Sequence, residues 1–76
     1  MNKNLRFYYN SNIVNKLSEL VTRFPQLRFH QILWSCGIFE TDKNGQILDK
    51  FYEEPDCTWN NMLETQIVKE LNNEVN

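Results

Sequence analysis

The chain has 76 residues, of which 41% are hydrophobic and 13% aromatic. This length allows one domain, and the apolar content is too high for a disordered segment. A membrane-spanning helix needs about 18 consecutive apolar residues, which the sequence does not contain. Its first residues also lack the pattern of a secretory signal. We therefore predict one globular domain, residues 1–76, in the cytoplasm.

Charge is divided unevenly along the chain. Residues 1–35 carry five basic residues against one acidic residue, a net charge of +4. Residues 36–76 carry three basic residues against nine acidic ones, a net charge of −6. Such a division is typical of a binding surface with one basic and one acidic side, or of two halves that attract each other within one fold. The pattern alone leaves both readings open.

The first third of the chain predicts a strand and then a helix. The alternation of Leu5, Phe7 and Tyr9 favours an N-terminal strand. Ser11 or Asn12 can then cap an amphipathic helix, because a short side-chain oxygen reaches the free amide groups of the first turn. The apolar residues of this helix fall on one face: Ile13, Leu17, Leu20, Val21 and Phe24. Pro25 ends it.

Two further helices are predicted. One runs over about residues 27–36 and stops at Gly37, where a left-handed residue is favoured. The last begins near Pro55, whose missing amide hydrogen costs nothing in a first helical turn. Its apolar residues recur every four positions: Trp59, Leu63, Ile67, Leu71 and Val75. The C-terminal end of this stripe packs either on the N-terminal strand or on a second copy of the chain. The second arrangement would be a homodimer through the third helix.

A turn signal lies between the last two helices. Asn44-Gly45 separates the short apolar runs 38–40 and 47–48, which predicts a β-hairpin of open register. The predicted fold class is therefore α+β, mostly α. It has three helices and one small hairpin, with the N-terminal segment as a third strand.

No residue pattern in the chain indicates catalysis. Cys36, Cys57 and His30 lack the paired spacings of a zinc site, and Cys36 and His30 point about 120° apart on one helix. The segment 40–51 resembles a calcium loop, but Phe51 stands where that loop needs a bidentate carboxylate. We predict a protein that is not an enzyme and has no cofactor or metal. The remaining catalytic alternative is a reactive Cys57, which the spacing to His30 does not exclude.

Aromatic residues suggest binding to another protein. Trp, Tyr and Arg are enriched among the residues that dominate interface energies. We predict that the partner is contacted by Tyr8, Tyr9, Arg28, His30 and Trp34. His30 and Trp34 lie one helical turn apart, so they can form an exposed pair or pack together at the edge of the core.

Nucleic-acid binding is the alternative. It would use Lys3, Arg6, Arg23 and Arg28 on phosphates, with nearby aromatic rings stacking on bases. The isoelectric point near 5.2 makes this alternative weaker, since domains of this kind are usually basic.

Residues 25–33, Gly37 and residues 49–55 resemble a pattern of short uncharacterised proteins found in bacterial genomes, phages and mobile elements. In that pattern a "PDLRFGQ" helix start is followed by a glycine turn and a "D-FYEE" entry to the last helix. Here Gln26 stands at the acidic position and His30 at the glycine. The family has no assigned activity. The resemblance implies a mobile-element origin and, as partner, a host protein such as a defence component.

Two helix starts carry opposite charges in this region. Arg28 precedes the second helix, and Glu53 and Glu54 precede the third. We predict an ion pair between Arg28 and one of these acids as a structural clasp, with Phe29 and Phe51 beneath it.

Overall fold

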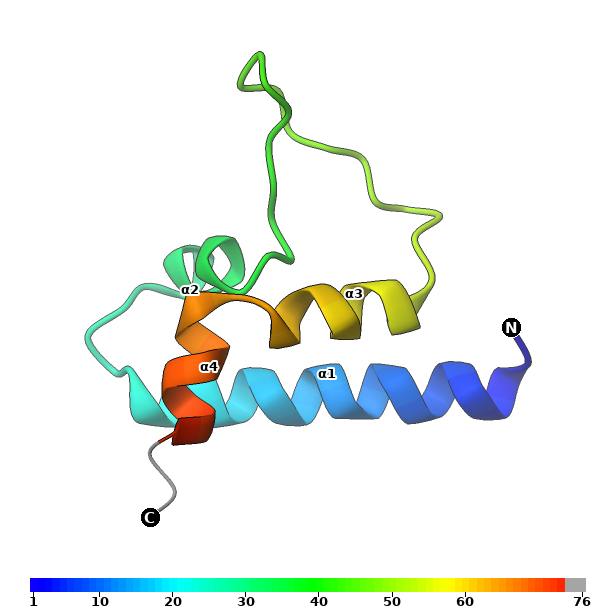
Figure 1. Cartoon of the computed structure of the whole chain (residues 1–76), viewed down its shortest axis with the longest axis horizontal. Helices are drawn as coiled ribbons and strands as arrows, with labels where there is room; N and C mark the ends of the chain where they lie inside the picture. Colours follow the sequence, from blue (N-terminus) through cyan, green and yellow to red (C-terminus); the bar gives the residue numbers. More distant parts are fainter. Residues whose placement is uncertain (74–76) are drawn as a thin grey trace.

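The computed structural model describes residues 1–73, which form four α-helices (Figure 1). In chain order these are α1 (Lys3–Arg23), α2 (Phe29–Ser35), α3 (Pro55–Leu63) and α4 (Gln66–Asn73). The long α1 lies along the edge of the molecule away from the connection between α2 and α3. Both α2 and α3 lie on one side of α1, and α4 crosses its C-terminal part in this view (Figure 1). No helix of residues 1–73 combines the length and the apolar character that crossing a bilayer requires.

The N-terminal segment is helical, so the predicted strand at residues 5–9 is wrong. The Asn2 side chain accepts a hydrogen bond from the Leu5 amide at 2.8 Å, which caps α1 well before Ser11. From there the helix runs unbroken to Arg23, and the Phe24 amide donates to the Leu20 carbonyl. Because Asn2 caps the helix, residues 5–9 are helical even though their apolar alternation also suits a strand.

One core joins all four helices. Its fully buried side chains are Leu20 of α1, Ile32 of α2, Cys36 at the end of α2, Met62 of α3 and Val68 of α4. Partly buried apolar residues pack around these five, among them Ile13, Leu17, Phe24, Leu27 and Trp59. The apolar face predicted for residues 13–24 is therefore the face that α1 buries, except that Val21 is about half exposed.

The predicted stop after the second helix is confirmed. Gly37 has a φ of +83°, a left-handed conformation that glycine adopts without a side-chain penalty. Its amide donates to the Trp34 carbonyl, and the Ile38 amide donates to the Leu33 carbonyl. These two bonds form the paired C-terminal motif that satisfies the last carbonyls of a helix.

The predicted third helix is two helices. It begins at Pro55 as expected, but α3 ends at Leu63, and α4 starts at Gln66. At the break, the Thr65 hydroxyl and amide both donate to the Met62 carbonyl. Apolar residues spaced four apart rotate by about 40° per step around a straight helix. In an unbroken helix, the last residues of the stripe would therefore face away from the core.

The break between α3 and α4 brings Val68 into the core. The described members of the stripe, Trp59, Leu63, Ile67 and Leu71, all pack against the chain's own core. Val75 lies outside the described residues. The stripe is therefore occupied within the chain as far as the structure describes it.

The predicted hairpin is also wrong. Residues 41 and 47 form a single isolated antiparallel bridge, and residues 1–73 contain no β-strand. The turn itself is well satisfied, because the Asp42 side chain accepts hydrogen bonds from the Asn44 and Gln46 amides. Ile47, however, is mostly exposed, so the flanks lack the buried face that would support a ladder. The fold class is therefore mainly α rather than α+β.

Candidate protein-binding loop

The connection between α2 and α3 is the largest irregular segment that the structure describes. This α2–α3 loop, residues 37–54, projects away from the helices on the side opposite α1 (Figure 1). Loops beyond about 12–15 residues without secondary structure are uncommon in compact domains and are usually functional. The length of the α2–α3 loop therefore makes it a candidate binding surface.

The base of the loop is held by one lysine. The Lys50 ammonium group donates hydrogen bonds to the Gly37 carbonyl at 2.7 Å and to the Glu40 carboxylate at 2.6 Å. The Lys50 side chain is only 20% exposed. The indole of Trp34 also packs against the ring of Phe39, with centroids 5.9 Å apart. These contacts join the start of the loop, its later part and α2.

Two adjacent aromatic residues stand out from this anchored loop. Phe51 is 81% exposed and Tyr52 is 88% exposed. Their rings meet edge to face with centroids 4.9 Å apart, and the Phe51 amide donates to the Asp49 side chain at 2.9 Å. Ile47 and Leu48 add exposed apolar surface on the same loop. Large apolar side chains presented together are informative, since single exposed ones are common.

Acidic side chains accompany the aromatic pair. Residues 40–56 carry six acidic residues against two lysines, a net charge of −4. Asp49 lies two residues before Phe51, and Glu53, Glu54 and Asp56 lie within four residues after Tyr52. Lys50 pairs with Glu40, and Glu54 pairs with an arginine of α1. The aromatic pair is thus presented in a negatively charged segment.

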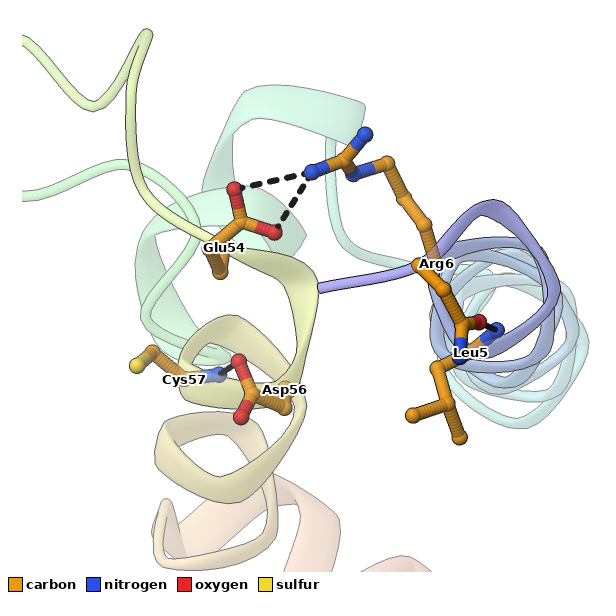
Figure 2. A network of polar contacts seen from close by, with 6 residues as sticks. Leu5, Arg6, Glu54, Asp56 and Cys57 are labelled. Carbon is orange, nitrogen blue, oxygen red and sulfur yellow. Dashed lines mark hydrogen bonds and ion pairs between the residues drawn. The ribbon is translucent and has the colours of Figure 1, made fainter.

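The ion pair at the start of α3 is formed by a residue of α1, and not by Arg28 as the sequence predicted. Arg6 donates to both oxygens of Glu54 at 3.0 and 3.1 Å (Figure 2). Glu53 instead accepts a hydrogen bond from the Thr58 hydroxyl. Arg28 has its backbone amide bonded to the Gln31 side chain, and within residues 1–73 it forms no ion pair with either acid. Only a helical N-terminus brings Arg6 to this position.

The Arg6–Glu54 pair is exposed, and that limits its strength. The two side chains retain 48% and 44% of their accessible surface. Exposed ion pairs are worth about 0–1 kcal/mol. The pair therefore orients the end of the loop against α1 more than it stabilises the fold.

The predicted partner-binding residues lie on two separate helices. Tyr8 is exposed and Tyr9 half-buried on α1, with ring centroids 5.1 Å apart. His30 packs edge to face with Phe29 at 6.2 Å, rather than with Trp34. Trp34 borders a shallow pocket of about 460 Å³ between α2 and α4. Tyr8 and Tyr9 therefore form a second ring pair, in which only Tyr8 is exposed, whereas both rings of the loop pair are exposed.

The basic residues proposed for nucleic-acid binding are dispersed. Lys3 and Arg23 mark opposite ends of α1, about 30 Å apart at 1.5 Å per residue. Arg6 is paired with Glu54, and the Arg23 guanidinium lies over the Phe24 ring at 5.2 Å from its centroid. Arg28 is the N-cap of α2. This arrangement offers no single row of cations to a phosphate backbone.

The two cysteines lie in different environments. Cys36 is buried, and desolvation raises the pKa of its thiol. Cys57 is exposed, and the neighbouring Asp56 carboxylate raises the pKa of its thiol (Figure 2). A raised pKa opposes formation of the thiolate, which is the nucleophilic form. No group of three or more His, Cys, Asp or Glu residues among the described positions could hold a metal ion.

The sequence prediction missed the four exposed loop residues as binding candidates. Ile47 and Leu48 were assigned to a hairpin, and Phe51 was placed beneath the clasp. The available signal was a set of large apolar side chains with no helix or strand period, next to turn residues and acids. Comparison of the chain with protein-family models, curated proteins and solved structures found no match.

Proposed function

We propose that this protein is a non-enzymatic interaction module that binds another protein through the α2–α3 loop. Phe51 and Tyr52 are the anchor residues of the interface. The observation that carries the proposal is their exposure, 81% and 88%, on a loop whose two sides Lys50 joins at the base and whose Phe39 packs on Trp34 of α2. Aromatic anchors of this kind dominate interface energies when a partner pocket covers them.

The anchored base favours binding because it lowers the cost of ordering the loop. A free loop loses conformational entropy when a partner immobilises it, about 1–2 kcal/mol for each residue fixed. Here Lys50 and the Asp42 turn already restrict the loop before it meets the partner. More of the energy from burying the two rings is then available as affinity.

The charge of the loop defines the partner surface that it fits. Acidic residues flank the aromatic pair on both sides, so a complementary partner has an apolar pocket rimmed by Lys or Arg. Such complementarity raises the association rate and disfavours acidic partners. The resemblance to phage and mobile-element proteins makes a bacterial host protein, such as a defence component, the first class to screen.

The test compares the loop with the predicted α1 position. Wild-type protein, the double variant F51S/Y52S and the single variant Y8S are immobilised and exposed to bacterial lysate, after circular dichroism has verified their folding. We expect a host protein that wild type and Y8S retain and the double variant loses. Its affinity, measured with purified components, should fall at least about 100-fold in F51S/Y52S, since each hot-spot residue is worth about 2 kcal/mol or more.

Two results contradict the proposal. In the first, the double variant retains the same partner with unchanged affinity. In the second, the protein binds DNA or RNA in a salt-dependent manner that weakens on neutralising Arg6, Arg23 and Arg28, which supports the nucleic-acid alternative.

A further inference from the structure

The outer side of α1 carries an apolar stripe that the protein's own core does not use. Phe7, Val14 and Val21 follow one another at intervals of seven residues. They are 74%, 63% and 46% exposed, respectively. Residues seven apart lie on nearly the same side of an α-helix and drift by only about 20° per repeat. The three side chains therefore form one continuous line on α1.

The positions between these residues are small and uncharged. Ser11 and Ser18 lie four residues after Phe7 and Val14, on the same side of the helix. A serine every seventh residue, alternating with an apolar residue, permits a second helix to approach closely. We call the surface formed by Phe7, Ser11, Val14, Ser18 and Val21 the uncharged α1 face.

Between Phe7 and Val21 the charged residues of α1 lie on other sides of the helix, whereas Lys3 lies on the same side as the stripe but before its N-terminal end. Arg6 reaches α3 through its contact with Glu54, and Lys16 bonds to Asn72 of α4 at 3.3 Å. The charged residues therefore leave the uncharged α1 face free of charge between Phe7 and Val21. Two copies of this face can meet without bringing like charges together, whereas a charged partner finds no complementary group on it.

The accessible surface is larger than expected for a monomer. The chain exposes 5766 Å², whereas a compact monomer of its mass exposes about 4,900 Å². The excess of about 900 Å² is similar to the roughly 800 Å² that one partner buries in a standard interface. The α2–α3 loop and the uncharged α1 face both contribute exposed apolar side chains to this surface, so an interface through α1 alone lies at the small end of the range, where transient complexes are found.

We propose that the occupant of the uncharged α1 face is a second copy of this chain, bound antiparallel about a two-fold axis at Val14. Val14 is midway between Phe7 and Val21, so antiparallel pairing places Val14 against Val14 of the second copy. It also places each Phe7 against a Val21, one large and one small apolar side chain on either side of the axis. The face is thus self-complementary, as a two-fold interface requires.

The dimer leaves the α2–α3 loop uncovered. The loop projects on the side of the molecule opposite α1 (Figure 1). A dimer joined through α1 therefore presents two loops, which strengthens attachment to any partner that has two binding sites. The inference does not depend on the proposed loop function, and F51S/Y52S should dimerise like wild type.

Sedimentation equilibrium tests the dimer with variants at its axis. Wild type should show a mass approaching twice 9.2 kDa at high micromolar concentration. V14E places two carboxylates against each other and should weaken self-association at least about 100-fold. N12E introduces the same charge two residues before Val14, about 160° around the helix from it, and should remain dimeric. An equimolar mixture of V14E and V14K should regain the dimer.

A crosslinking experiment tests the register separately. In a C57S background, V14C should form a disulfide between two chains on mild oxidation, and N15C should not, because only position 14 meets its own copy. Val14 is exposed, so these substitutions should leave the helical circular dichroism spectrum unchanged. A wild-type monomer at high micromolar concentration overturns the inference. So does a dimer that V14E does not weaken, or one that N15C crosslinks as fast as V14C.

Discussion

Replacing Lys50 tests whether the α2–α3 loop is anchored as its contacts indicate. In K50M the stem of the side chain keeps most of its volume, but the ammonium group is lost. The Gly37 carbonyl and the Glu40 carboxylate then lose a donor at 2.7 and 2.6 Å. We expect the loop to open more often while the helical core stays folded, since Lys50 does not belong to the core.

The magnitude follows from the two hydrogen bonds. Bonds that involve a charged group contribute about 1.5–3 kcal/mol, whereas exposed ion pairs contribute about 1 kcal/mol or less. Lys50 is 20% exposed and its partner Glu40 is 42% exposed, which places the combined loss near 2 kcal/mol. A loss of that size raises the population of the open loop about 30-fold.

Hydrogen exchange measures this opening at a single amide. The Leu48 amide donates to the Glu40 carbonyl at 2.9 Å, across the two sides of the loop. It should exchange about 30-fold faster in K50M, with the Cys36 amide in the core unchanged. Lys43 is exposed at the turn, so K43M is the matched control and should exchange like wild type. Equal rates in K50M and wild type, or equal acceleration by K43M, refute the anchoring role.

Two further predictions concern the core and the exposed thiol. Leu20 is fully buried whereas Leu5 on the same helix is about half exposed, so in urea denaturation L20A should lose about 3–4 kcal/mol and L5A about 1 kcal/mol. Similar losses would mean that Leu20 does not occupy the core. Because the Asp56 carboxylate raises the pKa of Cys57, the midpoint of its alkylation rate against pH should lie above the ordinary thiol value. In D56N that midpoint should move down, and an unmoved midpoint would exclude Asp56 as the cause.

The local signals in the sequence predicted several helix boundaries correctly. The helix that contains Leu17 and Leu20 ends just before Pro25, α2 stops at Gly37, and α3 starts at Pro55. Each of these features depends on the residue's own backbone or on neighbours within one helical turn. Proline and glycine act through their backbone geometry, so their effect is readable without a tertiary structure.

The binding loop could not be predicted in the same way, because exposure is a property of the whole fold. Phe51 and Tyr52 have the composition of core residues, and the sequence prediction treated Phe51 as one. The structure leaves both outside because five other side chains from the four helices already fill the core. Composition alone does not tell which apolar residues remain exposed once a small core is filled.

The sequence by itself determined the number of domains that the chain has room for, the amphipathic pattern of α1 and the helix ends at Pro25, Gly37 and Pro55. Contacts between distant segments decided the rest. The helical N-terminus brings Arg6 to Glu54, 48 residues later in the chain. The break before Gln66 changes the direction of the helix, so that Val68 lies in the core. Periodicity and capping are set by neighbours in the chain, whereas the choice between strand, bent helix and exposed loop depends on which surfaces find a partner to pack against.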